Sequence, residues 1–401
     1  MWEQQLIQKT RRRLDQGGLP LRVKFWDGRE YLPRVPEKMV LTLHAPSALR
    51  ALALPTLGRL ARAYVEDEFD IEGDIHEILA IGERLCAADA AADERGSPLL
   101  AWLRHSLPAD RKNIGFHYDV SNDFFGLWLD DRRVYSCAYF RRPEDSLELA
   151  QEQKLDLICR KLMLQPGERL LDIGCGWGGL IFWAAANYGV HCLGITLSQN
   201  QHDYVAAEIA RLGLADRVEV RLLDYREVPE DRPFDKIASV GMFEHVGRAN
   251  LGRYFAKIHR LLEPGGLVMN HGITAAGLYT QGLRSGISDF IEQYVFPGGE
   301  LTHVSSVIEA LTSEGLECVD VESLRPHYAR TLWHWVGRLE ANAARARALV
   351  GEKKYRIWRI YMAGSAHAFE RGWMSLSQIL AGRPRTDGTL SYPFTREHLY
   401  G

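Results

Sequence analysis

Short apolar runs alternate with amphipathic stretches from Arg169 onward, and this pattern predicts strands separated by helices. The runs expected as strands are Leu170–Ile173, Val190–Ile195, Val218–Leu222, Lys236–Val240 and Leu267–Asn270. Strands that alternate with helices form a parallel sheet covered on both faces. The sequence therefore predicts an α/β, doubly wound, mostly parallel sheet.

One helix and one interruption stand out within this pattern. A helix is expected over Leu251–Leu262, ended by Glu263-Pro264-Gly265-Gly266, because proline cannot continue a helix and glycine accepts the turn. After Gly272 the alternation stops until about His303. Such insertions near strand ends often form lids or substrate channels, so we expect one of these around residues 274–302.

The N-terminal part has a different pattern of shorter elements. From Leu21 to Leu85 prolines separate short strand-like and helical runs, and Asp27-Gly28 predicts a hairpin turn. The Ala-, Asp- and Glu-rich stretch Ala87–Gly96 is the best linker candidate, although its alanines could also continue a helix. We therefore expect a small α+β domain over residues 1–106 and a larger domain over 107–401.

Composition narrows the class of protein without defining its chemistry. The 401 residues are 46% hydrophobic and 25% charged, as in an ordinary globular protein. No apolar run reaches the roughly 20 residues of a membrane span, and the N-terminus lacks a signal-type stretch, so a cytoplasmic protein is expected. The six cysteines form no CxxC pair, so neither a disulfide framework nor a metal site is predicted.

Charge is unevenly distributed along the chain. The net charge is only -3, yet residues 1–34 carry eight Lys and Arg against four acids. This excess could contact an anionic surface, or it could be a solvated helix face. No extended basic stripe follows, which argues against a nucleic-acid partner.

Three elements at the ends of successive strands predict a cofactor site. The first strand leads into the turn Asp172-Ile173-Gly174-Cys175-Gly176-Trp177-Gly178, whose glycines let the backbone approach a ligand. The second strand ends at Thr196-Leu197-Ser198 without the carboxylate that holds a dinucleotide ribose, and Asp224-Tyr225 follows the third. This combination favours S-adenosylmethionine over NAD. The alternative is plain turn glycines with a surface Asp-Tyr pair.

Other segments have residue types unusual for turns, and they carry a family resemblance. They are residues 115–123 (GFHYDVSND), 135–139 (YSCAY), 241–245 (GMFEH), 296–299 (FPGG) and 326–328 (PHY). With them the chain resembles, from about Asn113 to Phe369, the cyclopropane fatty acid synthases and mycolic acid cyclopropane synthases. The resemblance implies a class I methyltransferase fold with a hydrophobic acyl tunnel, and it makes the insertion around residues 274–302 an acyl-binding one. It also implies methylation of a cis double bond in an unsaturated phospholipid acyl chain at the inner face of the membrane.

The resemblance further implies a ring closure in which bound bicarbonate is the base. The residues that match its ligands are Cys137, Glu244, His271, the amide of Ile273 and Tyr328. Each has a plainer reading when taken alone, such as a packed cysteine or a lid aromatic. The family often has His-Thr-Ile where this chain has His271-Gly272-Ile273, which puts the rigidity of that loop in question.

Cofactor roles for S-adenosylmethionine carry over by motif position. They fall on Tyr135, Ser136, Asp172, Gly174, Gly176, Thr196, Ser198, Gln201, Asp224 and Tyr225. Residues Leu19–Gly73 resemble the accessory domain of the longer synthases, which has a lipid-carrier-like appearance, and a homodimer is possible. Two rival functions stay open: a methyltransferase that gives a methyl-branched or methylene product, and a catalytically silent lipid-binding protein.

Overall fold

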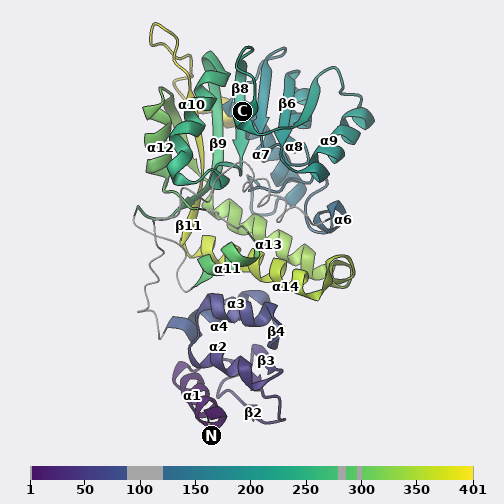
Figure 1. Cartoon of the computed structure of the whole chain (residues 1–401), viewed down its shortest axis with the longest axis vertical. Coiled ribbons are helices and arrows are strands. Elements are labelled where there is room, and N and C mark those ends of the chain that lie inside the picture. Colours follow the sequence, from purple (N-terminus) through teal and green to yellow (C-terminus); the bar gives the residue numbers. More distant parts are fainter. Residues whose placement is uncertain (1, 88–120, 279–285, 296–299, 401) are drawn as a thin grey trace.

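A computed structural model describes residues 2–87, 121–278, 286–295 and 300–400 of the chain. Two sheets organise it, a four-stranded one near the N-terminus and a seven-stranded one in the rest (Figure 1). The linker candidate after Ala87, the segment 296–299 and most of 115–123 lie outside the described residues. The boundary between residues 106 and 107 therefore stays a prediction.

The N-terminal unit combines a small sheet with helices, as its pattern predicted. Its elements are α1 (Trp2–Gly17), β1 (Leu21–Lys24), β2 (Glu30–Tyr31), β3 (Met39–Leu43), α2 (Leu49–Ala53), α3 (Leu57–Val65), β4 (Phe69–Gly73) and α4 (Ile75–Ala87). The strand order is β2-β1-β3-β4, with β1 and β3 parallel. The hairpin at Asp27-Gly28 is present, since β1 pairs antiparallel with β2 and Gly28 has φ +83°.

The larger unit is built on the predicted α/β alternation. Its main elements are α6 (Asn122–Phe125), α7 (Leu147–Lys161), β5 (Arg169–Ile173), α8 (Gly179–Tyr188), β6 (His191–Thr196), α9 (Gln199–Leu212), β7 (Val218–Leu222), β8 (Phe234–Val240), α10 (Leu251–Leu261) and β9 (Leu262–Ala275). The chain continues with α11 (Ile287–Tyr294), α12 (Val304–Ser313), β10 (Glu317–Ser323), α13 (Arg325–Ala341), α14 (Ala343–Glu370), β11 (Met374–Gly382) and α15 (Glu397–Tyr400).

The seven strands follow the order β10-β11-β9-β8-β5-β6-β7. The five predicted strands pair in parallel, which confirms the mostly parallel sheet. The sequence pattern missed β10 and β11, which add antiparallel to one edge. β9 spans Leu262–Ala275 and pairs with β11 from Leu267 to Ala275, so that His271 and Ile273 lie inside a strand and not after it.

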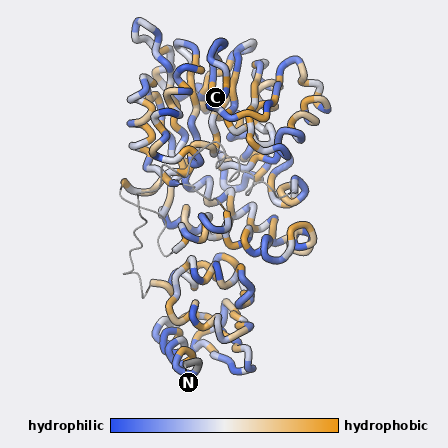
Figure 2. Tube along the Cα trace, viewed as in Figure 1, coloured by the Kyte–Doolittle hydropathy of each residue, from blue (hydrophilic) through white to orange (hydrophobic). Residues whose placement is uncertain are grey.

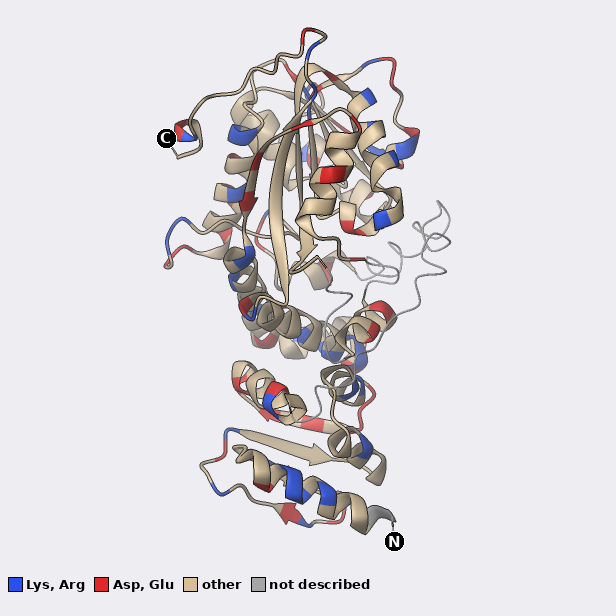
Figure 3. Cartoon of the chain, turned by 90° about the vertical axis from the view of Figure 1, so that its left-hand side faces the viewer, with Lys and Arg blue, Asp and Glu red and all other residues tan. Residues whose placement is uncertain are grey.

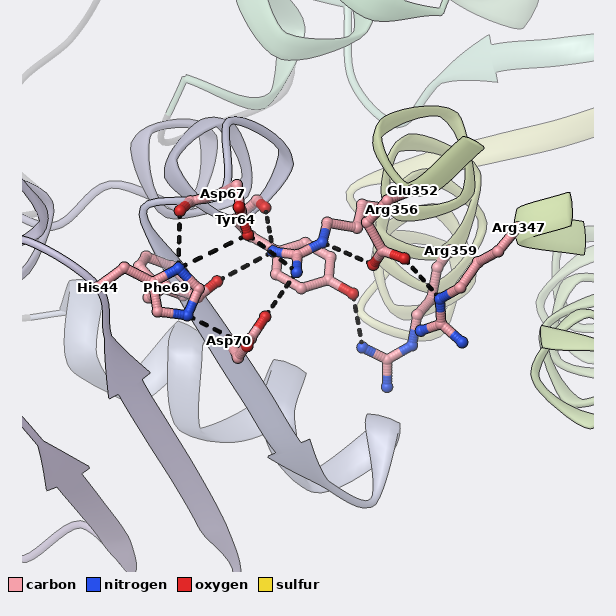
Figure 4. A network of polar contacts seen from close by, with 9 residues as sticks. All are labelled: His44, Tyr64, Asp67, Phe69, Asp70, Arg347, Glu352, Arg356 and Arg359. Carbon is pink, nitrogen blue, oxygen red and sulfur yellow. Dashed lines mark hydrogen bonds and ion pairs between the residues drawn. The ribbon is translucent and has the colours of Figure 1, made fainter. Parts of the chain in front are cut away.

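Helices α13 and α14 form a layer between the two units (Figure 1), and this layer carries both hydrophobic and hydrophilic turns (Figure 2). Arg356 of α14 fixes the N-terminal unit to this layer (Figure 4). Its guanidinium donates to the carbonyls of Tyr64 and Phe69 at 3.0 and 3.2 Å and to the Asp70 carboxylate at 2.6 Å. Only 8% of the Arg356 side chain is exposed, so these acceptors have no ready replacement by water.

Neighbouring contacts extend this clamp. Arg359 donates to the hydroxyl of Tyr64 at 3.1 Å, and Lys353 pairs with Glu66 at 2.7 Å. His44 contacts the carbonyl of Asp67 and the carboxylate of Asp70 (Figure 4). Side-chain atoms of His44, Asp67 and Asp70 lie within 4.8 Å of one another, but the two aspartates also pair with Arg356. The group is therefore part of the clamp between the units.

We expect Arg356→Leu to lower the stability of the folded chain by about 3 kcal/mol, because it leaves buried acceptors without a partner. Lys353→Leu is the matched control. It removes an exposed ion pair on the same helix and should cost about 1 kcal/mol or less. Thermal unfolding of the two variants beside the parent chain measures both effects. Equal, small changes in the two variants would show that Arg356 does not hold the units together.

Candidate active site

A pocket of about 450 Å³ opens at the carboxyl ends of β5, β6 and β7, where an open α/β sheet binds ligands. The predicted cofactor residues that line it are Tyr135, Ser136, Asp172, Gly174, Gly176, Thr196, Gln201, Asp224 and Tyr225. Ser198 is absent from the pocket wall. Its hydroxyl oxygen instead accepts a hydrogen bond from the Gln201 amide as the N-cap of α9. Ser198 therefore stabilises the turn that begins this helix.

The glycine turn has the backbone conformation that its sequence predicts. Gly174, Gly176 and Gly178 have φ of +81°, +56° and +85°, a region that side chains rarely adopt. A Cβ atom on Gly176 would meet no atom within 4 Å, so its absence leaves room inside the pocket. Trp177 donates to the side chain of Asn122 at 2.8 Å and thereby ties the turn to α6.

Charged side chains, Asp172 and Lys154 among them, line part of this pocket. Burial raises the pKa of Asp172 to about 7, although the nearby Lys154 opposes the shift. Burial also lowers the pKa of Lys154 to about 8, and its ammonium donates to the Ser136 hydroxyl at 2.8 Å. One carboxylate oxygen of Asp172 is buried without a hydrogen-bond partner. A cationic ligand would supply the interaction that this oxygen lacks.

At the third strand, Asp224 and Tyr225 lie where the sequence placed them. Arg226, which sequence reasoning did not single out, also lines the pocket and forms an ion pair with Asp224 at 2.8 Å. Its guanidinium lies 5.3 Å from the centre of the Tyr225 ring. The orientation of Asp224 toward a ligand is therefore set in part by Arg226.

Two of the five residues matched to an anion site are close in sequence to residues of this pocket wall. Cys137 follows Ser136 of the pocket wall, and Glu244 follows Gly241 and Met242. The Cys137 thiol contacts the carbonyl of Leu324 at 3.8 Å, and the Tyr328 amide donates to that same carbonyl at 3.0 Å. Leu324 in turn donates to Leu376, the cross-strand partner of Ile273. These contacts connect Cys137, Tyr328 and Ile273 through the backbones of Leu324 and Leu376.

Glu244 and the amide of Ile273 bind each other in this structure. The amide donates to one carboxylate oxygen of Glu244 at 2.7 Å, which differs from the expectation that it binds an anion directly. The other oxygen is buried without a partner. Burial raises the pKa of Glu244 to about 7, and the Ile273 amide opposes that shift.

Gly272 explains how the carboxylate fits beside the strand. A Cβ atom there would lie 2.3 Å from the Phe243 ring and 2.8 Å from the Glu244 carboxylate. The departure from His-Thr-Ile therefore makes space at this point. The question of loop rigidity is answered by β11, since Gly272 pairs with Ser377 inside the sheet.

A relay of buried side chains fixes the protonation of His271. Lys161 has no exposed side-chain surface and can only donate, so the oxygen of Gln378 faces it at 2.7 Å. The Gln378 nitrogen then donates to Nδ1 of His271 at 3.1 Å, which leaves the proton on Nε2. Burial lowers the pKa of His271 well below its usual range, so the ring is neutral. Its Nε2 is buried without a partner and offers one N–H donor.

The remaining two matched residues have mainly apolar surroundings. Cys137 is fully buried, and burial raises the pKa of its thiol, so it is a neutral group and not a nucleophile. The Tyr328 ring packs 4.8 Å from Phe369 and 6.0 Å from Trp335. Among the five matched residues, His271 thus presents a buried donor and Glu244 a buried acceptor that have no partner in the described part of the chain.

The comparisons with known proteins agree with this geometry. Residues 105–379 match the family model described as mycolic acid cyclopropane synthetase. The chain belongs to this family. It therefore has the class I methyltransferase fold that the resemblance implied.

Individual relatives fall into a longer and a shorter group. A probable fatty acid methyltransferase of Pseudomonas putida is 46% identical over 382 residues, covering 95% of this chain and 96% of the relative. Cyclopropane mycolic acid synthase 1 of Mycobacterium tuberculosis is 39% identical over 275 residues, covering 67% and 95%. The solved structure of mycolic acid cyclopropane synthase CmaA1 complexed with SAH and CTAB is 38% identical, with a TM-score of 0.64 and coverage of 68% and 98%.

We expect Gln378→Leu to disturb His271 without touching the pocket itself. The variant removes an acceptor from a buried ammonium and the donor that selects the His271 tautomer, which should cost about 2 kcal/mol of stability. Nitrogen-15 NMR of labelled histidines, assigned with His271→Phe, should show the proton on Nε2 in the parent chain and a mixture in the variant. Ser377→Ala, the neighbouring buried position on β11, is the control and should keep the parent tautomer. An unchanged tautomer in Gln378→Leu would contradict the relay.

Proposed function

We propose that this chain transfers the methyl group of S-adenosylmethionine to a cis double bond in a phospholipid acyl chain and closes a cyclopropane ring. The observation that carries the proposal is the pair of orphan groups on His271 and Glu244, which lie beside a pocket suited to a cationic ligand. A methyl transfer that stopped at a branched product has less need of such a pair. The relatives described as cyclopropane synthases support the same reaction.

The methyl donor fits the larger pocket. S-adenosylmethionine supplies a methyl group on a sulfonium cation, and Asp172 offers the unpartnered oxygen for the positively charged part of this ligand. The glycine turn leaves backbone room for the ligand, while Asp224 and Tyr225 are suited to the adenine. An alkene is a weak nucleophile, so the chain's main task is to hold it in line with the sulfonium methyl in a dry site.

The smaller site fits bicarbonate, which has one O–H donor and further acceptor oxygens. His271 would donate from Nε2 to one oxygen, and the free oxygen of Glu244 would accept the O–H. When bound, bicarbonate supplies the base that accepts the proton released in ring closure. Buried Cys137 and Tyr328 are the further proposed ligands of bicarbonate, and Glu244 is orientated by the Ile273 amide.

The substrate places the reaction at a membrane surface. No helix in the described ranges is long and apolar enough to cross a bilayer. Lys9, Arg11 and Arg12 are exposed on α1. Figure 3 shows basic turns on the N-terminal helix, at the end of the molecule away from the large sheet. Arg11 also donates to the carbonyl of Glu30, Arg13 donates to the carbonyl of Ala53, and Arg22 pairs with the Glu30 carboxylate. Some of the basic side chains in residues 1–34 are thus exposed and available to anionic lipid, and others bind groups within the N-terminal unit.

Gly176→Val should abolish measurable binding of S-adenosylmethionine or weaken it by about tenfold or more, because its side chain enters the pocket. Valine at a positive φ is also strained, so a control must carry the same strain elsewhere. Gly213→Val serves, since Gly213 has φ +66°, open space around it and a place at the end of α9 outside the pocket. Calorimetric titration of both variants decides. Equal weakening in the two would mean that strain, and not ligand contact, is responsible.

Glu244→Gln should retain S-adenosylmethionine binding and lose cyclopropane formation by roughly 10²–10⁴-fold, the usual contribution of general base catalysis. Glutamine presents a donor toward the bicarbonate O–H where an acceptor is needed. Glu300→Gln is the control, because Glu300 contacts the Glu244 backbone but its carboxylate binds the Arg248 amide.

Mass spectrometry of anionic vesicles incubated with each enzyme gives the readout, with and without carbon dioxide depletion. The parent enzyme should slow on depletion and recover when bicarbonate is added. Normal ring formation by Glu244→Gln, or full speed in depleted buffer, would show that another group is the base. A methyl-branched product from the parent enzyme would favour the rival reaction.

A further inference from the structure

A second cavity, of about 100 Å³, lies between the N-terminal unit and the α11 and α14 helices. On one side it is walled by β1, β3, β4, α3 and α4, and on the other by α11, α14 and the start of β11. Most of the side chains that face it are apolar, such as Ile78, Leu79, Phe290 and Ile360. Both units are needed to enclose this space.

Polar contacts surround this apolar cavity where the two units meet. His367 pairs with Glu83 at 3.0 Å, Tyr294 donates to Glu66 at 2.6 Å, and Arg356 pairs with Asp70 at 2.6 Å. Backbone packing is also close, because a Cβ atom on Gly58 of α3 would lie 1.9 Å from the carbonyl oxygen of Gly286. An apolar centre with a polar rim is typical of a space that excludes water.

Tyr361 connects this cavity to the reaction site. Its side chain lines the cavity and hydrogen-bonds with Tyr135, which lines the pocket proposed for the methyl donor. Burial raises the pKa of Tyr361, and the nearby Glu244 carboxylate raises it further. Met374 lines the cavity and pairs with Ala275 on β9, two positions along the ladder from Ile273. The cavity therefore adjoins the site at which the double bond must lie.

We propose that this cavity takes the methyl end of the substrate acyl chain, and that the N-terminal unit thereby selects chains by the length of tail beyond the double bond. The inference rests on the proposed function. Only the methyl end fits, because an ester or headgroup would lose its hydrogen bonds to water among these apolar side chains. The opposite end of the lipid stays with the membrane.

The comparisons with known proteins separate the N-terminal side of the cavity from the region that defines the family. The family model matches residues 105–379, so the cavity residues contributed by β1, β3, β4, α3 and α4 lie outside it. The Pseudomonas putida relative, by contrast, aligns over 95% of this chain. The described part of the expected acyl-binding insertion, α11, faces the N-terminal wall through Ile287 and Ile291. Tail selection is thus a property that the N-terminal unit adds to the family site.

Gly82 of α4 allows the cavity to be filled in steps. A Cβ atom there would touch only Leu57, at an ordinary 3.7 Å, so alanine fits and leucine extends into the cavity. Ala80→Leu is the matched control, because Ala80 lies on the same helix and does not line the cavity. Ala61→Leu fills the cavity from α3 and is the second variant if Gly82→Leu does not fold.

The assay uses vesicles of phosphatidylglycerol whose acyl chains have the double bond at one position and a short or a long saturated tail beyond it. The preference for the long tail should fall slightly in Gly82→Ala, by about tenfold in Gly82→Leu, and not in Ala80→Leu. The same preference in the parent enzyme, Gly82→Leu and Ala61→Leu would overturn the inference. No lipid product from the parent enzyme would instead overturn the proposed function.

A binding measurement tests the cavity without catalysis. An unsaturated fatty acid with a photoreactive diazirine at its methyl end should crosslink to α3 or α4 in the full-length chain, as located by peptide mass spectrometry. Gly82→Leu should reduce this crosslink severalfold while Ala80→Leu retains it. Crosslinks confined to residues of the seven-stranded unit would show that the tail takes another path.

Discussion

The antiparallel pairing of β9 with β11 is the contact on which both the proposed bicarbonate site and the proposed tail cavity depend. It runs without a register shift from Leu267 opposite Gly382 to Ala275 opposite Met374. This register sets Gln378 across from His271 and Leu376 across from Ile273, and it ends at the cavity wall. Successive side chains of a strand point to opposite faces of the sheet, so a slip of one residue would turn each of these side chains to the opposite face.

Three buried polar groups of the proposed ligand sites have no partner among the described residues. The free oxygens of Glu244 and Asp172 and the Nε2 of His271 cost stability when nothing binds them. The surrounding relay, from Lys161 through Gln378, is satisfied and holds His271 in one tautomer. Side chains whose hydrogen bonds are all made thus hold in place the groups that have none, and the binding site keeps its geometry without a ligand.

The sequence could predict those features that depend on local residue types. The five parallel strands, the Asp27-Gly28 hairpin and the glycine turn follow from hydrophobic period and backbone freedom, and all are present. Strands β10 and β11 were missed because polar residues such as Asp320 and Gln378 interrupt their apolar runs. The roles of Lys161 and Gln378 were missed because Gln378 meets His271 only through the register of β11.

The cavity between the two units could not be predicted, because its walls come from elements nearly the whole chain apart. Leu79 and Ile360 face the same space, yet either one alone looks like an ordinary core residue. The two units meet there through buried Arg356, whose acceptors are backbone carbonyls that no sequence pattern marks. The proposed methylation of an alkene requires a dry and well-ordered substrate, and an apolar cavity for the tail would favour both. In our proposal the N-terminal unit is therefore part of the substrate site, and polar contacts around the apolar cavity join it to the larger unit.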